Sequence, residues 1–125
     1  MTEFVVRVSN QPGRLAALAE RVAGAGINIE SLAAFSHDDV AVVRMIVDDP
    51  RAAARVLSEA GVPFEEHTIL STVLPNKPGE LAAMSHRLAE SQVNIDAMYM
   101  FHTDNDGLHF AVAVDDPDTA RAELD

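Results

Sequence analysis

The chain has 125 residues, a mass of 13.4 kDa and a formal net charge of −11, with 9 Lys and Arg against 20 Asp and Glu. This length holds one ordinary domain or two very small ones, which excludes a large multidomain enzyme. The negative charge argues against nucleic acid, an anionic membrane or a polyphosphate as partner, because cationic side chains bind such partners. With 48% hydrophobic residues, the composition is that of a folded domain.

The sequence contains no cysteine. This excludes disulfides, thiol nucleophiles, iron–sulfur clusters and thiolate zinc sites. No apolar run reaches the length of a signal peptide or of a membrane-spanning helix. We therefore expect a soluble cytoplasmic protein that holds no cofactor.

The beginning of the chain predicts a strand, a helix and two further strands. Phe4, Val6 and Val8 alternate with other residues at a period of two, which is typical of a strand. Apolar residues then recur at spacings of three and four from Leu15 to Ala25, as on one face of a helix. Two more strands are expected at residues 27–36 and 40–47, with a polar turn at 37–39.

A second helix is predicted by a capping signal. Asp49 is a favourable N-cap, Pro50 follows at the first helical position, and Gly61 ends the helix. Residues 62–67 then predict a short last strand. This order of elements is the ferredoxin-like βαββαβ unit, an antiparallel four-stranded sheet with both helices on one face.

The chain repeats this unit. The segment Asn10–Ala17 recurs 66 positions later as Asn76–Ala83, and Asp48-Asp49-Pro50 recurs 67 positions later, which we assign to a one-residue insertion in a hairpin turn. The sequence therefore predicts an α+β protein of two tandem ferredoxin-like units, residues 1–67 and 68–125. The second unit lacks the segment that matches residues 59–67, and with it the last strand.

Strand parity assigns side chains to the two faces of each sheet. The side chains expected to face the helices are Phe4, Val6, Ile29, Phe35, Val43, Met45, Val47, Leu70, Leu74, Ile95, Phe101, Phe110, Val112 and Val114. Those expected on the open face are Val5, Arg7, Leu32, Val42, Arg44, Ile46, Ile69, Val73, Met98, Met100, His102, His109, Ala111 and Ala113. The open face is too apolar for exposure to water, which predicts a homodimer formed through it.

Each copy carries Asn-x-Pro-Gly-x-Leu at its first strand-to-helix junction and an apolar-Asn-Ile sequence at its second strand. This pattern resembles the ACT domain, over nearly the whole chain, and two copies in register resemble stand-alone tandem ACT proteins. The resemblance implies a regulatory, allosteric module that binds a free amino acid between ACT units and signals to a protein partner. The ligand-binding residues it implies, with the adjoining loop positions, are Asn10, Gln11, Pro12, Gly13, Arg14, Leu15, Asn28, Asn76, Lys77, Pro78, Gly79, Glu80, Leu81 and Asn94.

The loop chemistry also favours a zwitterionic ligand. Gly13 and Gly79 stand where a helix begins, so unpaired backbone N–H groups and the helix dipole favour a carboxylate there. Asn10 and Asn76 offer both an acceptor and a donor. Asn before a helix and Pro-Gly in a turn equally shape a loop without a ligand. A ligand-free dimerisation or interaction module is therefore the alternative function.

His102 and His109 flank the predicted turn Thr103–Leu108. Pairing Phe101 with Phe110 places the two histidines opposite each other on the open face, close enough to share a metal. We expect no metal site, because interface histidines more often pack or hydrogen-bond, and keep the pair as a candidate. Asp104–Gly107 resembles part of a calcium loop but lacks the spaced ligands and distal Glu, so we interpret it as a hairpin turn.

No catalytic motif is visible: the sequence has no nucleophile elbow, zinc-protease motif, Walker loop or dinucleotide fingerprint. An RNA-binding version of the topology needs aromatic residues on the open face and basic charge. Phe35, Phe101 and Phe110 are expected to face the helices, and Lys77 is the only lysine. An acylphosphatase-like enzyme needs an Arg and an Asn acting on a phosphate in a single unit. We therefore expect a protein that is not an enzyme.

Overall fold

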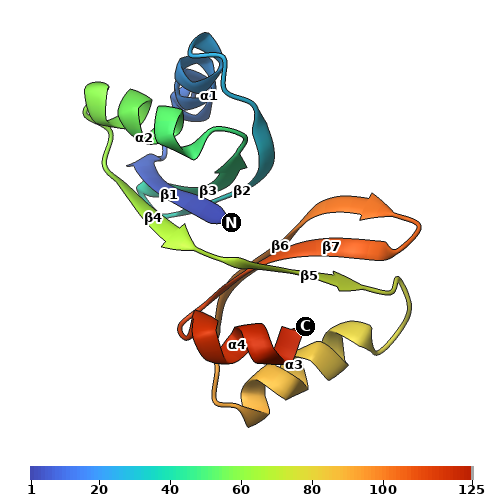
Figure 1. Ribbon diagram of the computed structural model, residues 1–125. Coiled ribbons are helices and arrows are strands. Elements are labelled where there is room, and N and C mark those ends of the chain that lie inside the picture. Colours follow the sequence, from blue (N-terminus) through green and yellow to red (C-terminus); the bar gives the residue numbers. More distant parts are fainter. Residues whose placement is uncertain (125) are drawn as a thin grey trace. The chain divides into compact units, whose positions relative to one another are not determined.

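The computed structural model describes residues 1–124, and its contacts divide the chain into two compact units (Figure 1). The first unit is Thr2–His67. The second runs from Thr68 onward and includes Met1, whose carbonyl oxygen accepts a hydrogen bond from the Ile69 N–H at 2.9 Å. Asp125, the last residue of the predicted second unit, lies outside the described residues. None of the helices in residues 1–124 has the length and apolar character needed to cross a bilayer.

The first unit has the predicted βαββαβ order. Its elements are β1 (Thr2–Ser9), α1 (Arg14–Gly24), β2 (Ile29–His37), β3 (Val40–Val47), α2 (Pro50–Glu59) and β4 (Phe64–Thr68). The strands form one sheet in the order β2-β3-β1-β4, and both helices cover the same face of it (Figure 1). Asp49 caps α2 as predicted, because its side chain accepts a hydrogen bond from the Ala52 N–H at 3.1 Å.

The second unit repeats this order without the final strand. Its elements are β5 (Leu70–Leu74), α3 (Glu80–Glu90), β6 (Ile95–Asp104), β7 (Gly107–Val114) and α4 (Pro117–Leu124). The sheet order is β5-β7-β6, so within residues 1–124 the strand β5 has a partner on one side only. Both helices again lie on one face (Figure 1). The prediction of a second ferredoxin-like unit that lacks its last strand is confirmed.

Each unit has its own hydrophobic core between its sheet and its helices. The buried residues of the first core are Phe4, Val6, Leu18, Val22, Ile27, Val43, Met45, Val47, Ala53 and Leu57. Those of the second are Leu70, Leu74, Met84, Leu88, Val93 and Ala120, with Ile95, Phe110 and Val114 packed against them. Alternation along strands and three-to-four spacing along helices therefore identified most of both cores.

Two expected face assignments in β2 are wrong. A bulge between Ile29 and Ser31 reverses the parity of the rest of the strand, so Phe35 pairs with Val42 and Leu32 pairs with Met45. Directly paired residues lie on the same face of a sheet. Phe35 therefore lies on the open face, where its side chain is 54% exposed, and Leu32 lies on the helix face.

The equivalent strand β6 carries two bulges, the first between Ile95 and Ala97. It moves Met98 and Met100 from the expected open face to the helix face, where they pair with Val112 and Phe110. Met98 packs against the second core. The expected pairing of Phe101 with Phe110 is thus wrong.

The second bulge lies between Met100 and His102 and places Phe101 on the open face, with its ring centroid 6.0 Å from that of His109. Strand β6 has 10 residues and β2 has 9, so the insertion predicted for the turn lies in this bulge. The expected absence of aromatic residues from the open face was one of two arguments against RNA binding. Because Phe35 and Phe101 lie on open faces, that argument is wrong, and only the negative net charge still argues against RNA.

Candidate functional site

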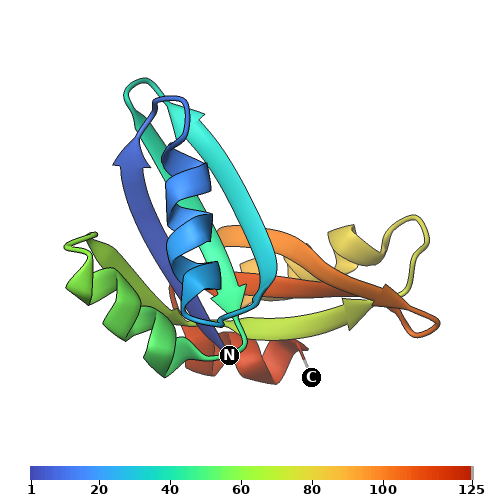
Figure 2. The same ribbon diagram turned by 90° about the horizontal axis from the view of Figure 1, so that it is seen from above.

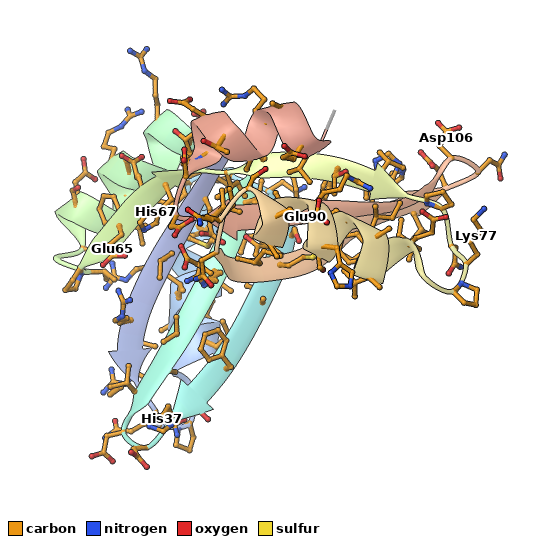
Figure 3. All side chains as sticks on the ribbon, turned by 90° about the horizontal axis from the view of Figure 1, so that it is seen from below. His37, Glu65, His67, Lys77, Glu90 and Asp106 are labelled. Atoms are coloured by element: carbon orange, nitrogen blue, oxygen red, sulfur yellow. The ribbon has the colours of Figure 1, made fainter. Side chains whose placement is uncertain are left out.

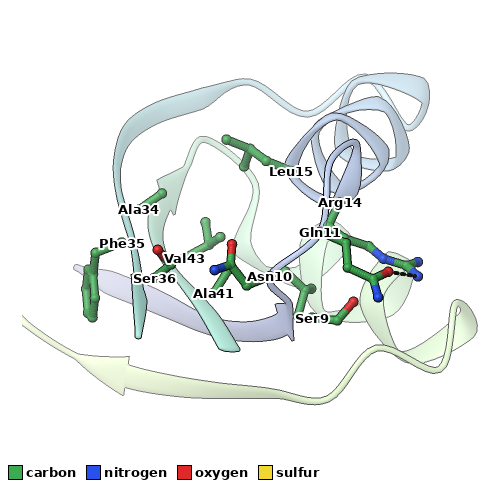
Figure 4. Close-up of a pocket in the computed structure, with 11 residues that line it drawn as sticks. Ser9, Asn10, Gln11, Arg14, Leu15, Ala34, Phe35, Ser36, Ala41 and Val43 are labelled. Carbon is green, nitrogen blue, oxygen red and sulfur yellow. Dashed lines mark hydrogen bonds between the residues drawn. The ribbon is translucent and has the colours of Figure 1, made fainter. Parts of the chain in front are cut away.

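A cavity of about 240 Å³ lies between the start of α1 and the helix face of the first sheet (Figure 4). It is lined by Val8, Ser9, Asn10, Gln11, Arg14, Leu15, Ala34, Ser36, Ala41 and Val43, and by Phe35, whose ring points away from the others toward the open face (Figure 4). The loop motif predicted four of these residues, namely Asn10, Gln11, Arg14 and Leu15. The structure therefore brings both variable positions of the motif, together with its Asn and Leu, around one space.

Small side chains on the sheet leave this space open. Ala34 pairs with Val43, Ser36 pairs with Ala41, and all four residues lie on the helix face. Most of the lining residues are exposed, so the space opens to solvent. The sequence pattern does not identify Ala34 and Ser36 as lining residues, because alternation without the β2 bulge places Phe35 on this face. The sequence feature that could have revealed these lining residues is the run of small side chains near the end of the first strand of the β2–β3 hairpin.

The α1 N-terminus forms one wall of the cavity. Gly13 is the N-cap residue with φ +87°, and its carbonyl oxygen accepts from the Ala17 N–H at 2.9 Å. The N–H groups of Leu15 and Ala16 belong to the first turn, where donors have no intrahelical acceptor. An added Cβ at Gly13 would meet no atom within 4 Å, so the positive φ is what requires glycine here.

The β1–α1 loop is fixed to the β2–β3 turn by Asn10. Its backbone N–H donates to the Asp39 carbonyl oxygen at 2.8 Å, and its side-chain Nδ2 donates to the Asp38 carbonyl oxygen at 2.9 Å. Figure 4 shows the side-chain oxygen of Asn10 directed into the cavity. Asn10 therefore shapes the loop with its donors and presents an acceptor to the cavity.

A positive charge stands at the same helix end. Arg14 occupies the first turn of α1, which contains no acidic residue, and its Nη2 donates to Gln11 Oε1 at 3.0 Å (Figure 4). The helix dipole favours a negative group at this position. Arg14 and the free N–H groups together form a site suited to a carboxylate.

The corresponding loop of the second unit differs in charge. Gly79, preceded by Pro78, is again a left-handed N-cap residue, with φ +90°. Here Glu80 stands in the first turn of α3, and its Oε1 lies 3.5 Å from Lys77 Nζ. In the second unit the carboxylate of Glu80 thus stands at the start of α3. In the first unit Arg14 makes the start of α1 positively charged.

The second unit also differs in side-chain volume. The pairs Val8–Ala41 and Ala34–Val43 of the first sheet correspond to Leu74–Leu108 and Met100–Phe110 of the second. Each of the four positions has a larger side chain in the second unit, and Leu74 and Phe110 belong to its packed core. The open space beside α1 is therefore a property of the first unit.

The predicted ligand residues Asn28 and Asn94 do not join these loops within their own units. Asn28 follows the C-terminal end of α1, and Figure 2 shows that this helix runs along the strands away from the β1–α1 loop. The backbone N–H of Asn28 donates to Asp48 Oδ1, and that of Asn94 donates to Asp115 Oδ1, each at 2.9 Å. Pro12 precedes Gly13 and does not line the cavity.

The two candidate histidines do face each other. His102 pairs with His109 across β6 and β7, with ring centroids 5.0 Å apart. Asp104, predicted from the sequence only as part of the turn, joins them, because its Oδ2 lies 2.9 Å from His109 Nε2 and 3.4 Å from His102 Nε2. The hydrogen bond with His109 holds the pKa of Asp104 below its usual value.

Comparison with known families finds two matches. The family described as "ACT domain" matches residues 2–62, and the one described as "ACT domain pair" matches residues 37–124. The second match covers well over half of the chain. No match is found among curated protein sequences.

Solved structures with this fold cover almost the whole chain. Protein BT0572 from Bacteroides thetaiotaomicron is similar with a TM-score of 0.88 and 26% identity, over 98% of this chain and 85% of that protein. The ligand-free regulatory subunit of aspartate kinase from Thermus thermophilus gives 0.70 and 18%, over 98% and 87%. The corresponding subunit from Thermus flavus gives 0.63 and 19%, over 98% and 88%. At these identities the two kinase subunits show a shared fold.

Proposed function

Because the chain belongs to the ACT domain family, and carries two of these domains in tandem, we propose that it is a regulatory module that binds one free amino acid per chain, in the first unit. The observation that carries this proposal is the cavity beside Arg14 and the α1 N-terminus. It combines a cationic end, an acceptor and an apolar floor.

The groups around the cavity match the two charges of an amino acid. Arg14 and the N–H group of Leu15 suit the carboxylate. The side-chain oxygen of Asn10 suits the ammonium group, because it is an acceptor directed into the same space (Figure 4). A zwitterion is neutral overall, so the net charge of −11 does not repel it.

The size of the cavity favours a small ligand. Its volume of about 240 Å³ is several times the ~30 Å³ that one water molecule occupies in the liquid. Pockets for drug-sized molecules start at about 300 Å³. Val8, Ala34 and Val43 form the floor, which favours an apolar or small side chain on the ligand.

Two or three charge-assisted hydrogen bonds at about 1.5–3 kcal/mol each correspond to dissociation constants from millimolar to micromolar. A thermal-shift screen against the twenty amino acids therefore requires millimolar concentrations. A ligand present at about 100 times its Kd stabilises the protein by about 2.7 kcal/mol. Titration calorimetry of the best ligand then gives the stoichiometry, for which we expect one molecule per chain.

The two units supply a matched pair of variants. Ala34→Met puts into the first unit the side chain that the second unit has at Met100, and we expect it to abolish amino-acid binding. Met100→Ala makes the reverse change, and we expect it to leave the affinity unchanged. Loss of binding in Met100→Ala would place the site in the second unit instead, and two ligands per chain would contradict a site confined to the first unit.

A dimerisation module without a ligand is the alternative function. It predicts that none of the twenty amino acids shifts the unfolding temperature at millimolar concentration. It also predicts that Ala34→Met and Met100→Ala behave alike toward amino acids. The screen and the two variants therefore separate the alternatives.

A further inference from the structure

From the β6–β7 hairpin of the second unit we infer a divalent metal site formed by His102, Asp104 and His109, suited to Zn²⁺. The three residues contribute two imidazole nitrogens and a carboxylate oxygen, and these atoms all lie within 4.8 Å of one another. This cluster lies outside the cavity proposed for the amino acid, which belongs to the other unit.

Strand register places all three side chains on one face. His102 pairs with His109, and Asp104 pairs with Gly107, two positions further along both strands. Side chains two positions apart on a strand point to the same side. Both pairs therefore lie on the open face of the sheet.

The inserted residue of β6 produces this arrangement. At the bulge between Met100 and His102, both Phe101 and His102 stand opposite His109. Without the extra residue, Phe101 would pair with His109, and His102 would turn toward the helices. Bulges commonly re-aim a side chain in this way. The first unit, which lacks the insertion, has no comparable histidine pair among its described residues.

The distances suit tetrahedral coordination. Ligands bound at the usual zinc distances of about 2.0–2.2 Å lie about 3.3 Å from one another in a tetrahedron. Asp104 Oδ2 is 2.9 Å from His109 Nε2 and 3.4 Å from His102 Nε2. The nitrogens of the two histidines lie within 4.8 Å of each other, so metal binding would draw them closer together. A water molecule would supply the fourth ligand.

Neighbouring groups hold the ligands in place. The Asp106 N–H donates to Asp104 Oδ1 at 2.9 Å, which leaves Oδ2 directed at the histidines. The Phe101 ring contacts His109 edge-on, with an interplanar angle of 71°. His109 is the least exposed of the three side chains, at 20%, against 38% for Asp104 and 56% for His102. Such outer contacts orient metal ligands, and solvent has access from the His102 side.

The donor set selects the metal class. Two imidazoles with one carboxylate are typical of Zn²⁺ and its transition-metal neighbours, whereas Ca²⁺ and Mg²⁺ prefer sites made of oxygen alone. The protein has an overall negative charge, which attracts cations. Asp106 and Lys77 lie at the same end of the second unit (Figure 3), so the site stands near the β5–α3 loop.

Titration calorimetry of the full chain with ZnCl₂ in a chelator-free buffer tests the proposal. We expect one Zn²⁺ per chain with a micromolar Kd, and no heat with MgCl₂ or CaCl₂. Zinc should also shift the imidazole ¹⁵N resonances of His102 and His109. His102→Ala and His109→Ala should each weaken binding at least tenfold, and Asp104→Asn should weaken it while keeping the turn.

His67→Ala is the matched control, because His67 also contacts a carboxylate, with Nε2 3.0 Å from Glu65 Oε2, but belongs to no cluster of three possible metal ligands among residues 1–124. This variant should bind zinc as the unaltered chain does. Backbone NMR spectra establish that each variant is folded. Absence of zinc binding, or unchanged affinity in the folded His102→Ala and His109→Ala variants, would overturn the proposal.

Discussion

Asn94 and Asp115 exchange two hydrogen bonds: the Asn94 N–H donates to Asp115 Oδ1 at 2.9 Å, and the Asp115 N–H donates to the Asn94 carbonyl oxygen at 3.1 Å. Asn28 and Asp48 make the same exchange in the first unit, with the same two distances. Each bridge joins the residue before one strand to the residue after its neighbour. The asparagines contribute only backbone atoms to these bonds.

This geometry predicts unequal effects of two substitutions. Asp48→Ala removes an acceptor, so we expect it to lower the free energy of unfolding by about 1 kcal/mol. Asn28→Ala keeps both hydrogen bonds and should change the free energy of unfolding by much less. Urea denaturation of the two variants measures the difference. An equal loss in Asn28→Ala would mean that the asparagine side chain itself stabilises the fold.

Much of the fold could be predicted because its signals are local. Asp49-Pro50 marks the start of α2, and the repeated motif marks the starts of α1 and α3. The register of β2 could not be predicted, because alternation assumes that each residue faces one partner. The bulge after Ile29 breaks that assumption and reverses every later position.

The same bulge explains which part of the candidate site could be predicted. Asn10 and Arg14 belong to a contiguous motif, so the sequence alone identified them. Ala34 and Ser36 reach the cavity only in the shifted register. The difference in side-chain size between Ala34 and Met100 is visible in the sequence. Its effect on the cavity can be inferred only once both residues are known to face the helices.

Gly13 is expected to be required for its backbone conformation. Its φ is +87° and the space around it is open, so Gly13→Ala adds strain without a clash. A side chain in left-handed backbone costs about 1–2 kcal/mol, and Gly13→Asn should cost less because Asn tolerates this conformation. Gly24→Ala, at a helical glycine without positive φ, is the control and should not destabilise the protein. Thermal unfolding measures all three, and a Gly13→Ala protein as stable as the unaltered chain would contradict the argument.

Acid should weaken the interactions of Glu65 in the first unit. The hydrogen bond with His67 and the Arg7 guanidinium, whose Nη1 lies 3.1 Å away, hold the pKa of Glu65 below its usual value. A carboxylate whose pKa is lower in the folded state contributes stability above its unfolded pKa, about 4.3 for Glu. That contribution is lost as pH falls through the folded pKa.

We therefore expect the stability difference between the unaltered chain and Glu65→Gln to be present near pH 6 and to shrink below about pH 4. Urea denaturation at several pH values measures it. The effect should be small, because the Glu65 and Arg7 side chains are each 51% exposed. Glu66→Gln is the control, since the adjacent strand position points to the opposite face. A difference that grows on acidification would have the wrong sign.

The open face of the first sheet carries exposed apolar side chains at the end next to the β2–β3 turn. Phe35 pairs with Val42 across β2 and β3, and Val40 is exposed beside them. Contiguous apolar surface of this kind is typical of an interface. We predict that a second copy of the chain covers it and that the protein is a homodimer in solution.

Phe35→Glu should shift this dimer toward monomer, because dimerisation would bury an unpaired carboxylate. Leu81→Glu is the matched control: Leu81 is similarly exposed, but it lies on α3 and not on an open sheet face. Light scattering coupled to size-exclusion chromatography gives the mass of each variant. A monomeric unaltered chain would refute the dimer, and dissociation by Leu81→Glu alone would place the interface on the helix side.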